Sequence, residues 1–587
     1  MLFQMIFRAA LPALHGIPPD LEKGAGFIDS VNEQPAWIRI LKTRFDKIND
    51  FLSSHGLFEW IGFAVVLYQI TVSAWVCDDA FHGLQMVRNL VEHHQFVYVL
   101  GERVSVSTCP FHTLLIAGLY AIFGNAYLCA VISGILLSAA AVFLLFFKTC
   151  KGNTRRIIIF TLCMFYSRCF ISYTTSGLEN SMLFLLAGLF LYIYLKTDDD
   201  FGMKKLLLMA LLVGIIAGTR MDAVLIFVPA CIAVYFVGCF TKEKWIKRYI
   251  AGFVGLLPFI LWLIFSVIYF GVPFPNTAYI KLNTGFPVSD YLYNGLRYVG
   301  CTFLFDPIMI LTIAAYLVLV FVKAQKKHFL IAAGVIIYAV YIVRVGGDFM
   351  VGRHFTLMFY ISLFGISDLL GSGVRIKENK VLKVMFNRYF FTAAALIAFS
   401  LLDEYAFYTR SPNVNITGVA DERDYYFPST SLKKYLSKTG GESGLRKYAY
   451  SGYVYELRET GGLVPFCGGY HIFYWGNDKK VLDSMGIGDA LLARLPYDIE
   501  ATRERYPDVK PWRIGHIVRI FPDGYNDTIK TGKNLIKNES LAEYYDKLSL
   551  VISGDIFSPE RMKAVYELNT GKYDYLIEEY LSSLDDG

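Results

Sequence analysis

The stretch LFEWIGFAVVLYQITVSAWVCDD, residues 57–79, is a long apolar run that ends on two adjacent aspartates. Its apolar part has the length needed to cross a bilayer core, which takes about 20 residues. Residues 1–56 mix Pro, Gly and charged residues and lack the pattern of a cleavable signal peptide. The run therefore predicts a retained membrane anchor that follows a cytoplasmic segment at 1–56 and closes at Asp78 and Asp79.

The composition of the whole chain supports a membrane protein. Of its 587 residues, 55% are hydrophobic and only 18% are charged, with a mean hydropathy of +0.43. Soluble domains have about 25% charged residues, so an ordinary soluble enzyme is excluded. The net charge of +6 is spread over short clusters, which argues against a nucleic-acid partner. The ten cysteines form no CxxC pair, so neither a zinc site nor a disulfide framework is indicated.

Apolar stretches of about the spanning length recur along the first two thirds of the chain. They lie near 57–76, 127–147, 157–171, 181–195, 206–219, 223–240, 249–270, 302–322, 329–343, 354–370 and 389–403. Basic connections, such as 148–156 and 323–327, alternate with connections that carry the acidic residues. By the positive-inside rule we expect a polytopic α-helical membrane protein with about eleven transmembrane helices, its N-terminus inside and its tail outside.

One further apolar segment, residues 110–123, would break this alternation if it crossed the membrane. We interpret it, and the amphipathic segment at 79–91, as helices on the outer membrane surface within a transmembrane domain at 57–404. A twelfth span is the alternative. Residues 405–587 are charged, contain no spanning run, and predict a soluble extracytoplasmic domain. Its strand-like segments, at 463–476 and 512–525, precede helix-like segments at 540–552 and 561–569, so we expect mixed α and β structure.

Acidic residues at the predicted outer level are candidates for catalysis. Asp78 and Asp79 end the first span, where a carboxylate can take a proton from an attacking hydroxyl. The alternative is that Asp79 merely caps the helix that follows. Glu179 and Asp222 are further acids at this level. Either can instead pair with a neighbouring arginine, and for Asp222 we favour a structural pair with Arg220.

Cations at the same level are candidates for binding an anionic lipid phosphate through charge-assisted hydrogen bonds. They are Lys281, Arg344, Arg353 and His354. Headgroup contact at the end of a span is their alternative role. Candidate substrate-binding residues in these outer segments are His82, Glu179, Arg220, Asp222, Asn276 and Asp348, the last of which follows a pair of glycines. Gly-rich nucleotide loops, HExxH and GxSxG are absent, so nucleotide-driven transport and zinc hydrolysis lack support.

The order of several motifs carries a resemblance to a known family. The segment DDAFHGLQMVRNLVEHHQFVYVLGERV is followed by TSGLEN, TRMDA, FPNTAYIK and GGDFMVGRH. In the tail come YHIFYWG, DSMGIGDALLARLP, WRIGHIVRIFPDGY and IFSPERMKAVYELN. Together, over about residues 60–575, they resemble the AftB-type arabinofuranosyltransferases, which are GT-C membrane glycosyltransferases. The family usually has a bulkier apolar stretch where this chain has HGLQ.

This resemblance implies transfer of a sugar, arabinofuranose in the family, from a polyprenyl-phosphate donor to a glycan hydroxyl outside the cytoplasm. It also marks the acidic pair, here Asp78 and Asp79, as the active site. The sequence shows no required cofactor and leaves room for a divalent cation. The predicted location is the cell membrane, in contact with membrane lipids. The alternatives are a GT-C transferase for a different sugar and a transporter or flippase of lipid-linked sugars, against which the polar residues crowd one membrane face.

Overall fold

The computed structural model describes residues 56–150, 152–197, 201–237, 241–282, 286–371, 412, 417–451, 468–475, 483–505 and 517–585. Residues Gly56–Gly587 belong to one compact unit. The predicted cytoplasmic segment at 1–56, apart from its last residue, lies outside the described residues. The predicted span at 389–403 and the predicted domain boundary at 404 also lie outside them.

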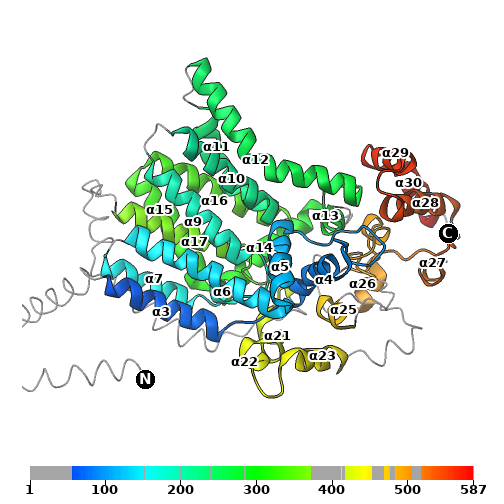
Figure 1. The fold of residues 1–587 in the computed structure, drawn as a ribbon, viewed down its shortest axis with the longest axis horizontal. Coiled ribbons are helices and arrows are strands. Elements are labelled where there is room, and N and C mark those ends of the chain that lie inside the picture. The colour runs from blue at the N-terminus through cyan, green and yellow to red at the C-terminus, as the bar shows by residue number, and fades with distance from the viewer. Residues whose placement is uncertain are drawn as a thin grey trace, which may run out of the picture. The chain divides into compact units, whose positions relative to one another are not determined.

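Helices make up the first two thirds of the described chain (Figure 1). They are α3 (Leu57–Val72), α4 (Asp78–His93), α5 (Pro110–Phe123), α6 (Ala126–Leu145), α7 (Thr154–Tyr166), α8 (Arg168–Tyr173), α9 (Asn180–Lys196), α10 (Met203–Thr219), α11 (Val228–Tyr235), α12 (Lys242–Phe270), α13 (Asn276–Leu282), α14 (Val288–Phe305), α15 (Pro307–Lys323), α16 (Lys326–Arg344) and α17 (Phe355–Gly371). A π-helical turn at Phe146–Cys150 extends α6, and a 3-10 helix at Met221–Ile226 precedes α11.

Polar residues define where several of these helices begin. The side chains of Asn125, Asn153, Ser167 and Asp306 each accept a hydrogen bond from a backbone N–H in the first turn of α6, α7, α8 and α15, respectively. Such caps satisfy N–H groups that have no partner inside the helix. Ser167 and Asp306 lie inside stretches that the sequence predicts to be single spans, and they divide those stretches into two helices.

The number of spans is smaller than the sequence predicts. Within the described residues, three helices are long and apolar enough to cross a membrane: Ala126–Cys150, Glu243–Phe270 and Lys326–Arg344. A fourth is reached if Val288–Phe305 and Pro307–Lys323, bent by 108° at Asp306, count as one broken span. The prediction of about eleven spans is therefore wrong, because several apolar stretches contain helix breaks or form shorter helices. The described chain is helical, and it contains apolar helices that are long enough to span a membrane.

The apolar helices pack against one another along their lengths. α6 lies beside α9, which also contacts α17, and α10 lies against α12 (Figure 1). Gly255 permits the last of these approaches, because a Cβ there would be 2.4 Å from the Cβ of Ala210. Small residues at such positions let two helix backbones come close together. α9 in this way runs through the middle of the bundle, and its two ends carry the charged residues discussed below.

The part of the chain after residue 417 is also helical. It contains α21 (Glu422–Thr430), α22 (Leu432–Tyr435), α23 (Gly441–Ser451), α25 (Gly469–Trp475), a 3-10 turn at Leu492–Arg494, α26 (Ile499–Arg505), α27 (Tyr525–Thr531), α28 (Glu539–Ser553), α29 (Pro559–Asn569) and α30 (Asp574–Asp585). Among the described residues only isolated β-bridges occur, and no strand. The prediction of mixed α and β structure is wrong for this part, whereas the helices expected at 540–552 and 561–569 are confirmed.

Helix α25 shows why the strand prediction failed. Tyr470, Phe473 and Tyr474 follow one another at helical spacing, and all three rings contact Phe81 on α4. A short apolar run has no periodicity that distinguishes a strand from a buried helix. The segment that it packs against therefore determines which of the two it forms. Here the partner is α4, which is predicted to lie on the membrane surface but is largely buried on both its apolar and its polar side.

Candidate active site

A cavity opens where the N-terminal end of α4 meets the loops that precede α5 and α9. Its volume is about 1400 Å³, counting the part that is open to solvent. Six residues that the sequence singles out line it: Asp78, Asp79, His82, Glu179, Lys281 and Arg353. They come from four separate segments of the chain, and the fold brings them into one space.

The cavity also has a wall that sequence reasoning missed. It consists of hydroxyl, thiol and imidazole side chains from the α5 region and α13, together with two residues of the tail: Ser107, Thr108, Cys109, His112, Thr113, Thr277, Glu422 and Tyr426. Hydroxyl groups both donate and accept hydrogen bonds, which suits a polyhydroxylated ligand. Isolated serines and threonines in short loops carry no sequence signal, so only the fold identifies this wall.

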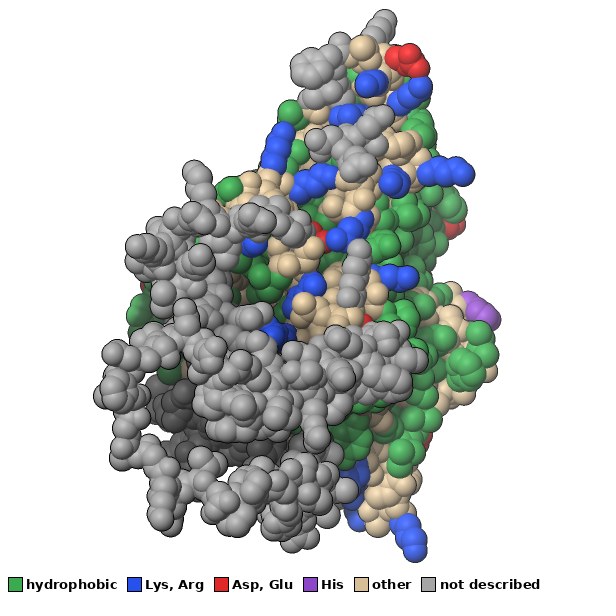
Figure 2. Space-filling view, turned by 90° about the vertical axis from the view of Figure 1, so that its left-hand side faces the viewer, with side chains coloured by type: hydrophobic (Ala, Val, Ile, Leu, Met, Phe, Trp, Pro, Cys, Tyr) green, Lys and Arg blue, Asp and Glu red, His purple; other side chains and the backbone are tan. Residues whose placement is uncertain are grey.

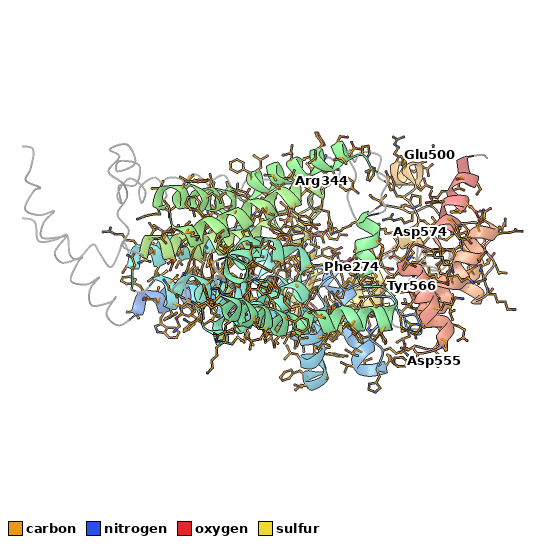
Figure 3. The ribbon with its side chains drawn as sticks, turned by 90° about the horizontal axis from the view of Figure 1, so that it is seen from above. Phe274, Arg344, Glu500, Asp555, Tyr566 and Asp574 are labelled. Carbon is orange, nitrogen blue, oxygen red and sulfur yellow. The ribbon has the colours of Figure 1, made fainter. Side chains whose placement is uncertain are left out.

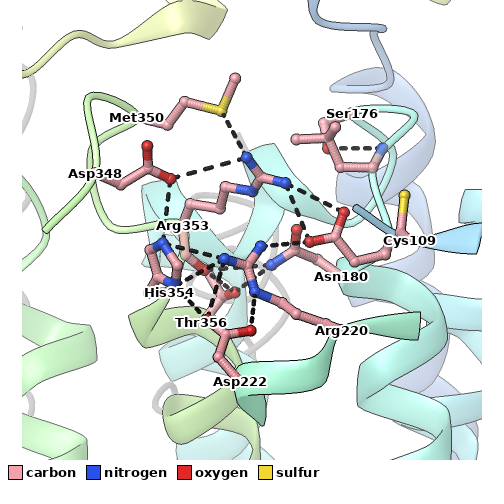
Figure 4. Close-up of polar contacts among 12 residues, drawn as sticks. Cys109, Ser176, Asn180, Arg220, Asp222, Asp348, Met350, Arg353, His354 and Thr356 are labelled. Atoms are coloured by element: carbon pink, nitrogen blue, oxygen red, sulfur yellow. Dashed lines mark hydrogen bonds and ion pairs between the residues drawn. The ribbon is translucent and has the colours of Figure 1, made fainter. Parts of the chain in front are cut away.

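Two arginines, Arg220 and Arg353 (both labelled in Figure 4), hold the buried carboxylate of Glu179, which lines the cavity. Arg353 Nη2 lies 3.1 Å and 3.2 Å from its two oxygens, and Arg220 Nη1 lies 2.6 Å from one of them. Burial raises the pKa of Glu179, but attraction by Arg353 and Arg220 outweighs burial and holds that pKa well below its usual range. Glu179 is therefore ionised and fixes the orientation of Arg353, which itself lines the cavity.

A second group of charges lies behind these arginines. His354 Nε2 is 3.3 Å from Asp348 Oδ2, and Arg353 Nη1 is 3.8 Å from the same oxygen (Figure 4). Arg220 Nε donates to Asp222 at 2.9 Å, which is the structural pair that the sequence favours. Burial, with help from nearby Arg220, lowers the pKa of His354. Arg220, Asp222, Asp348 and His354 are not among the residues that line the cavity, and their contacts support the residues that do.

The acidic pair occupies the first turn of α4, and its two members have different surroundings. The N-cap of α4 is Cys77 and makes no side-chain cap hydrogen bond, so Asp79 is the second helical residue rather than the cap. Asp78 accepts backbone hydrogen bonds from Gly469 at 3.2 Å and Tyr470 at 2.9 Å. Asp78 thus ties the first turn of α25 to α4, while Asp79 lines the cavity from a half-buried position.

His82 lies one helical turn after Asp78 and is 7% exposed. Its Nδ1 is 2.9 Å from the hydroxyl of Tyr98, a residue that the sequence did not single out. Burial lowers the pKa of His82 to about 4, so the imidazole is neutral at physiological pH. Within the described chain, Asp78, Asp79 and His82 form the group of side chains whose ligand atoms are close enough together to hold a metal ion.

Two further predicted residues do not line the cavity. Arg344, labelled in Figure 3, is exposed at the end of α16 and is not among the lining residues. Asn276 donates to the backbone carbonyl of Asp489 at 3.1 Å and so fastens the tail to α13. The remaining cation, Lys281, is exposed and lines the cavity from α13.

A search against models of known protein families finds no match, and a search of curated proteins finds no relative. The resemblance to arabinofuranosyltransferases accordingly stays a prediction that comes from the residues quoted above.

Proposed function

We propose that the protein is a membrane glycosyltransferase of the GT-C class. In this proposal it moves a sugar from a polyprenyl-phosphate donor to a hydroxyl of a glycan acceptor on the outer side of the cell membrane. The observation that supports it most is the single cavity in which the carboxylates of Asp78 and Asp79 lie together with Arg353 and Lys281. That combination supplies a proton acceptor for an attacking hydroxyl and cations for a departing phosphate.

The proposed reaction is a substitution at the anomeric carbon of the donor. The acceptor oxygen forms a bond to this carbon, the bond from the carbon to the phosphate oxygen breaks, and polyprenyl phosphate leaves with the electron pair. Asp79 accepts the proton of the acceptor hydroxyl. Arg353 and Lys281 stabilise the negative charge that gathers on the leaving phosphate, because preorganised charges in a water-poor site act strongly on a developing anion.

Other residues act in this proposal by positioning these groups. Glu179 holds the guanidinium of Arg353 by contacts to both carboxylate oxygens, so the fork of Arg353 keeps one orientation. Asp78 fastens α25 beside the first turn of α4. The hydroxyl-rich wall of the cavity binds sugar hydroxyls. The resemblance favours arabinofuranose as the transferred sugar. The alternative is a GT-C transferase that uses a different sugar, and the same assay tests both.

The direct test is a transfer assay with purified full-length protein in lipid vesicles. The protein is incubated with decaprenylphosphoryl-arabinose and an arabinose-containing oligosaccharide, and the products are analysed by mass spectrometry. We expect the acceptor to gain one pentose residue, and we expect Asp79→Asn to abolish this gain. Asp527→Asn, which changes an exposed acid in the first turn of α27, is the matched control and should transfer normally.

Two results would contradict the proposal in different ways. If polyprenyl-phosphate donors of other sugars extend the acceptor and the arabinose donor does not, the reaction class stands and the sugar is another one. If no donor is consumed but a fluorescent lipid-linked sugar crosses the vesicle membrane in a protein-dependent manner, the protein is a flippase and the transferase proposal fails.

A further inference from the structure

A second cavity lies between α8, α21 and the end of α14. Its volume is about 620 Å³, counting the part that is open to solvent. None of the site residues that the sequence predicts is among its lining residues. Its chemistry comes mainly from Arg168 and Ser172 of α8, Phe305 of α14, and Arg423, Asp424 and Phe427 of α21.

Helix α21 lines both this second cavity and the first one, which contains the acidic pair. Glu422 and Tyr426 line the first cavity, whereas Arg423 and Phe427 line the second. Successive residues of a helix point about 100° apart, so two neighbouring faces of α21 serve the two spaces. A helix with its side chains is about 10–12 Å across, so the two cavities are separated by about one helix.

The loop before α17 also contributes to both cavities. Phe349 and Arg353 line the first, and Val351 lines the second. A parallel β-bridge between Met350 and Ala420 joins this loop to the residues that lead into α21, and the N–H of Val351 donates to the carbonyl of Ala420 at 3.0 Å. The wall between the two cavities therefore consists of two segments that are fastened to each other.

Two arginines in the second cavity are placed over aromatic rings. The guanidinium carbon of Arg168 is 4.3 Å from the ring centre of Phe305, and that of Arg423 is 4.5 Å from the ring centre of Phe427. Such a contact is an attraction between the cation and the face of the ring, and it uses none of the N–H groups of the guanidinium for hydrogen bonds. The rings thus hold the guanidinium groups in place without taking up their donors.

Arg423 and Ser172 have hydrogen-bonding groups without partners. Within the described chain the guanidinium of Arg423 makes no hydrogen bond and no ion pair, and its Nε is buried. The hydroxyl of Ser172, a residue that is 7% exposed, likewise makes no hydrogen bond to a described residue. Buried polar groups normally have partners, and unpaired ones cost free energy. Two such groups that line one cavity indicate a hydrogen-bonding ligand.

The charges of the second cavity select the kind of ligand. Arg168 and Arg423 are balanced by Asp421 and Asp424, so the lining side chains carry no net charge. An anion would meet two carboxylates, and a cation would meet two guanidinium groups. A hydroxyl group can both donate to a carboxylate and accept from a guanidinium, and it adds no charge. A sugar, which carries several hydroxyls on a compact ring, therefore fits this set of side chains best.

We propose that the second cavity binds one sugar residue of a glycan chain, with Arg423 and Ser172 hydrogen-bonded to its hydroxyls. The identification of this glycan as the acceptor rests on the proposed function, whereas the sugar-binding cavity itself does not. A chain of several sugar residues is long enough to cross one helix, so a residue held here places another part of the same chain near Asp79 in the first cavity. In this way the protein prefers long acceptors to short ones.

The test uses purified full-length protein in lipid nanodiscs without any sugar donor. Hexasaccharides of arabinose, galactose or mannose, each with a photoreactive diazirine group, are cross-linked to the protein by light, and the labelled peptides are identified by mass spectrometry. We expect at least one of these hexasaccharides to label α8 and α21 in a saturable manner. The same hexasaccharide without the diazirine should compete for this labelling.

Two variants and one control test the residues of the second cavity. Arg423→Gln removes the charged donor and should weaken the affinity for the hexasaccharide on the order of tenfold. Ser172→Ala is the second variant, in case Arg423→Gln disturbs the fold, and it should weaken the affinity by roughly a factor of five. Lys433→Gln is the matched control, because Lys433 is an exposed cation on α22 that lines neither cavity, and its affinity should equal that of the unchanged protein.

Three results would each overturn the proposal. They are the absence of saturable labelling of α8 and α21 by all three hexasaccharides, an unchanged affinity in the folded variants, and displacement of the label by inorganic phosphate but not by the unlabelled hexasaccharide, which would identify an anion site. Because no donor is present, the result does not depend on transfer. Labelling without any transfer activity would remove the acceptor role and leave the sugar site, whereas transfer without labelling would remove this inference alone.

Discussion

Helix α9 connects two clusters of charged side chains that differ in what surrounds them. At its N-terminal end, Glu179 is held between Arg353 and Arg220 and lines the cavity. At its C-terminal end, Lys196 forms an ion pair with Asp368, whose other oxygen lies 3.2 Å from His328 Nε2. The 17 residues of α9 separate the two ends by about 25 Å. Both clusters are unusual for apolar helices of this kind, and the first of them lines the cavity of the candidate active site.

The cations at the second end have backbone partners that account for them. Lys327 donates to the carbonyl of Thr197, directly after α9, and Arg156 donates to the carbonyl of Ser367 at 2.8 Å. Such contacts satisfy carbonyl groups at helix C-termini and complement the helix dipole. Figure 2 shows Lys and Arg side chains over the described part of this end of the bundle. The comparison teaches that buried charge marks a candidate site only where carboxylates and cations also face open space.

The largest effect expected from this comparison is the labelling of introduced cysteines from one side of the membrane only. If the basic end faces the cytoplasm, a cysteine at Lys326 should react with an impermeant maleimide only from the inside, and one at Asp527 only from the outside. The parent chain supplies the background, since its described cysteines are buried or half-buried. Labelling of both positions from the same side would contradict the assignment of the two ends to opposite faces.

The next effect is the loss of transfer when the acidic pair is changed. Asp79→Asn keeps the size of the side chain but cannot accept a proton, so we expect the transfer rate to fall on the order of a hundredfold or more. Asp368→Asn makes the same change at the basic end and should leave transfer unaltered. Equal losses in the two variants, measured in the vesicle assay, would mean that the cavity end has no special role.

Asp78→Asn compares the roles of the two adjacent aspartates, Asp78 and Asp79. Asp78 accepts two backbone hydrogen bonds from α25, and asparagine can accept only one of them with its single carbonyl oxygen. We expect a smaller loss of transfer than for Asp79→Asn, together with faster hydrogen exchange in α25. A loss as large as that of Asp79→Asn, with α25 unchanged, would assign the proton transfer to both aspartates.

How much of this site the sequence predicted depends on the kind of contact. Asp79, Glu179 and Arg353 each lie next to an apolar run in the sequence, so it could be predicted that the ends of these runs bring them near one another, and all three line the cavity. Contacts such as that of Asp78 with Tyr470, which are 392 positions apart, have no local signal. The helix break at Ser167 was missed for another reason, because hydropathy averages over a single capping residue.

A smaller effect, about tenfold on the transfer rate, is expected for Arg353→Lys. Lysine keeps the positive charge, but it lacks the planar fork that contacts Glu179 and approaches Asp348 at the same time. Arg156→Lys makes the same change at the basic end, where a single ammonium group can still donate to Ser367, and the rate should not change. A normal rate in Arg353→Lys would indicate that Lys281, rather than the guanidinium of Arg353, binds the phosphate.

The last effect concerns stability rather than transfer and contrasts two buried carboxylates with opposite surroundings. Glu179 has two arginines, whereas Asp489 in the tail accepts hydrogen bonds from the backbone of Leu491 and Leu492 and from the hydroxyl of Tyr525. Burial raises the pKa of Asp489 to about 7, while an unfolded chain gives an aspartate a pKa of about 3.9. Between these values the folded state keeps a proton that the unfolded state has lost, so this group favours folding most at low pH. Its contribution falls as the pH rises from about 4 to about 7, by at most about 1.4 kcal/mol per pH unit. Asp489→Asn removes the titration and should flatten the pH dependence of thermal unfolding relative to the unchanged chain in this range, whereas identical slopes would show that Asp489 ionises normally.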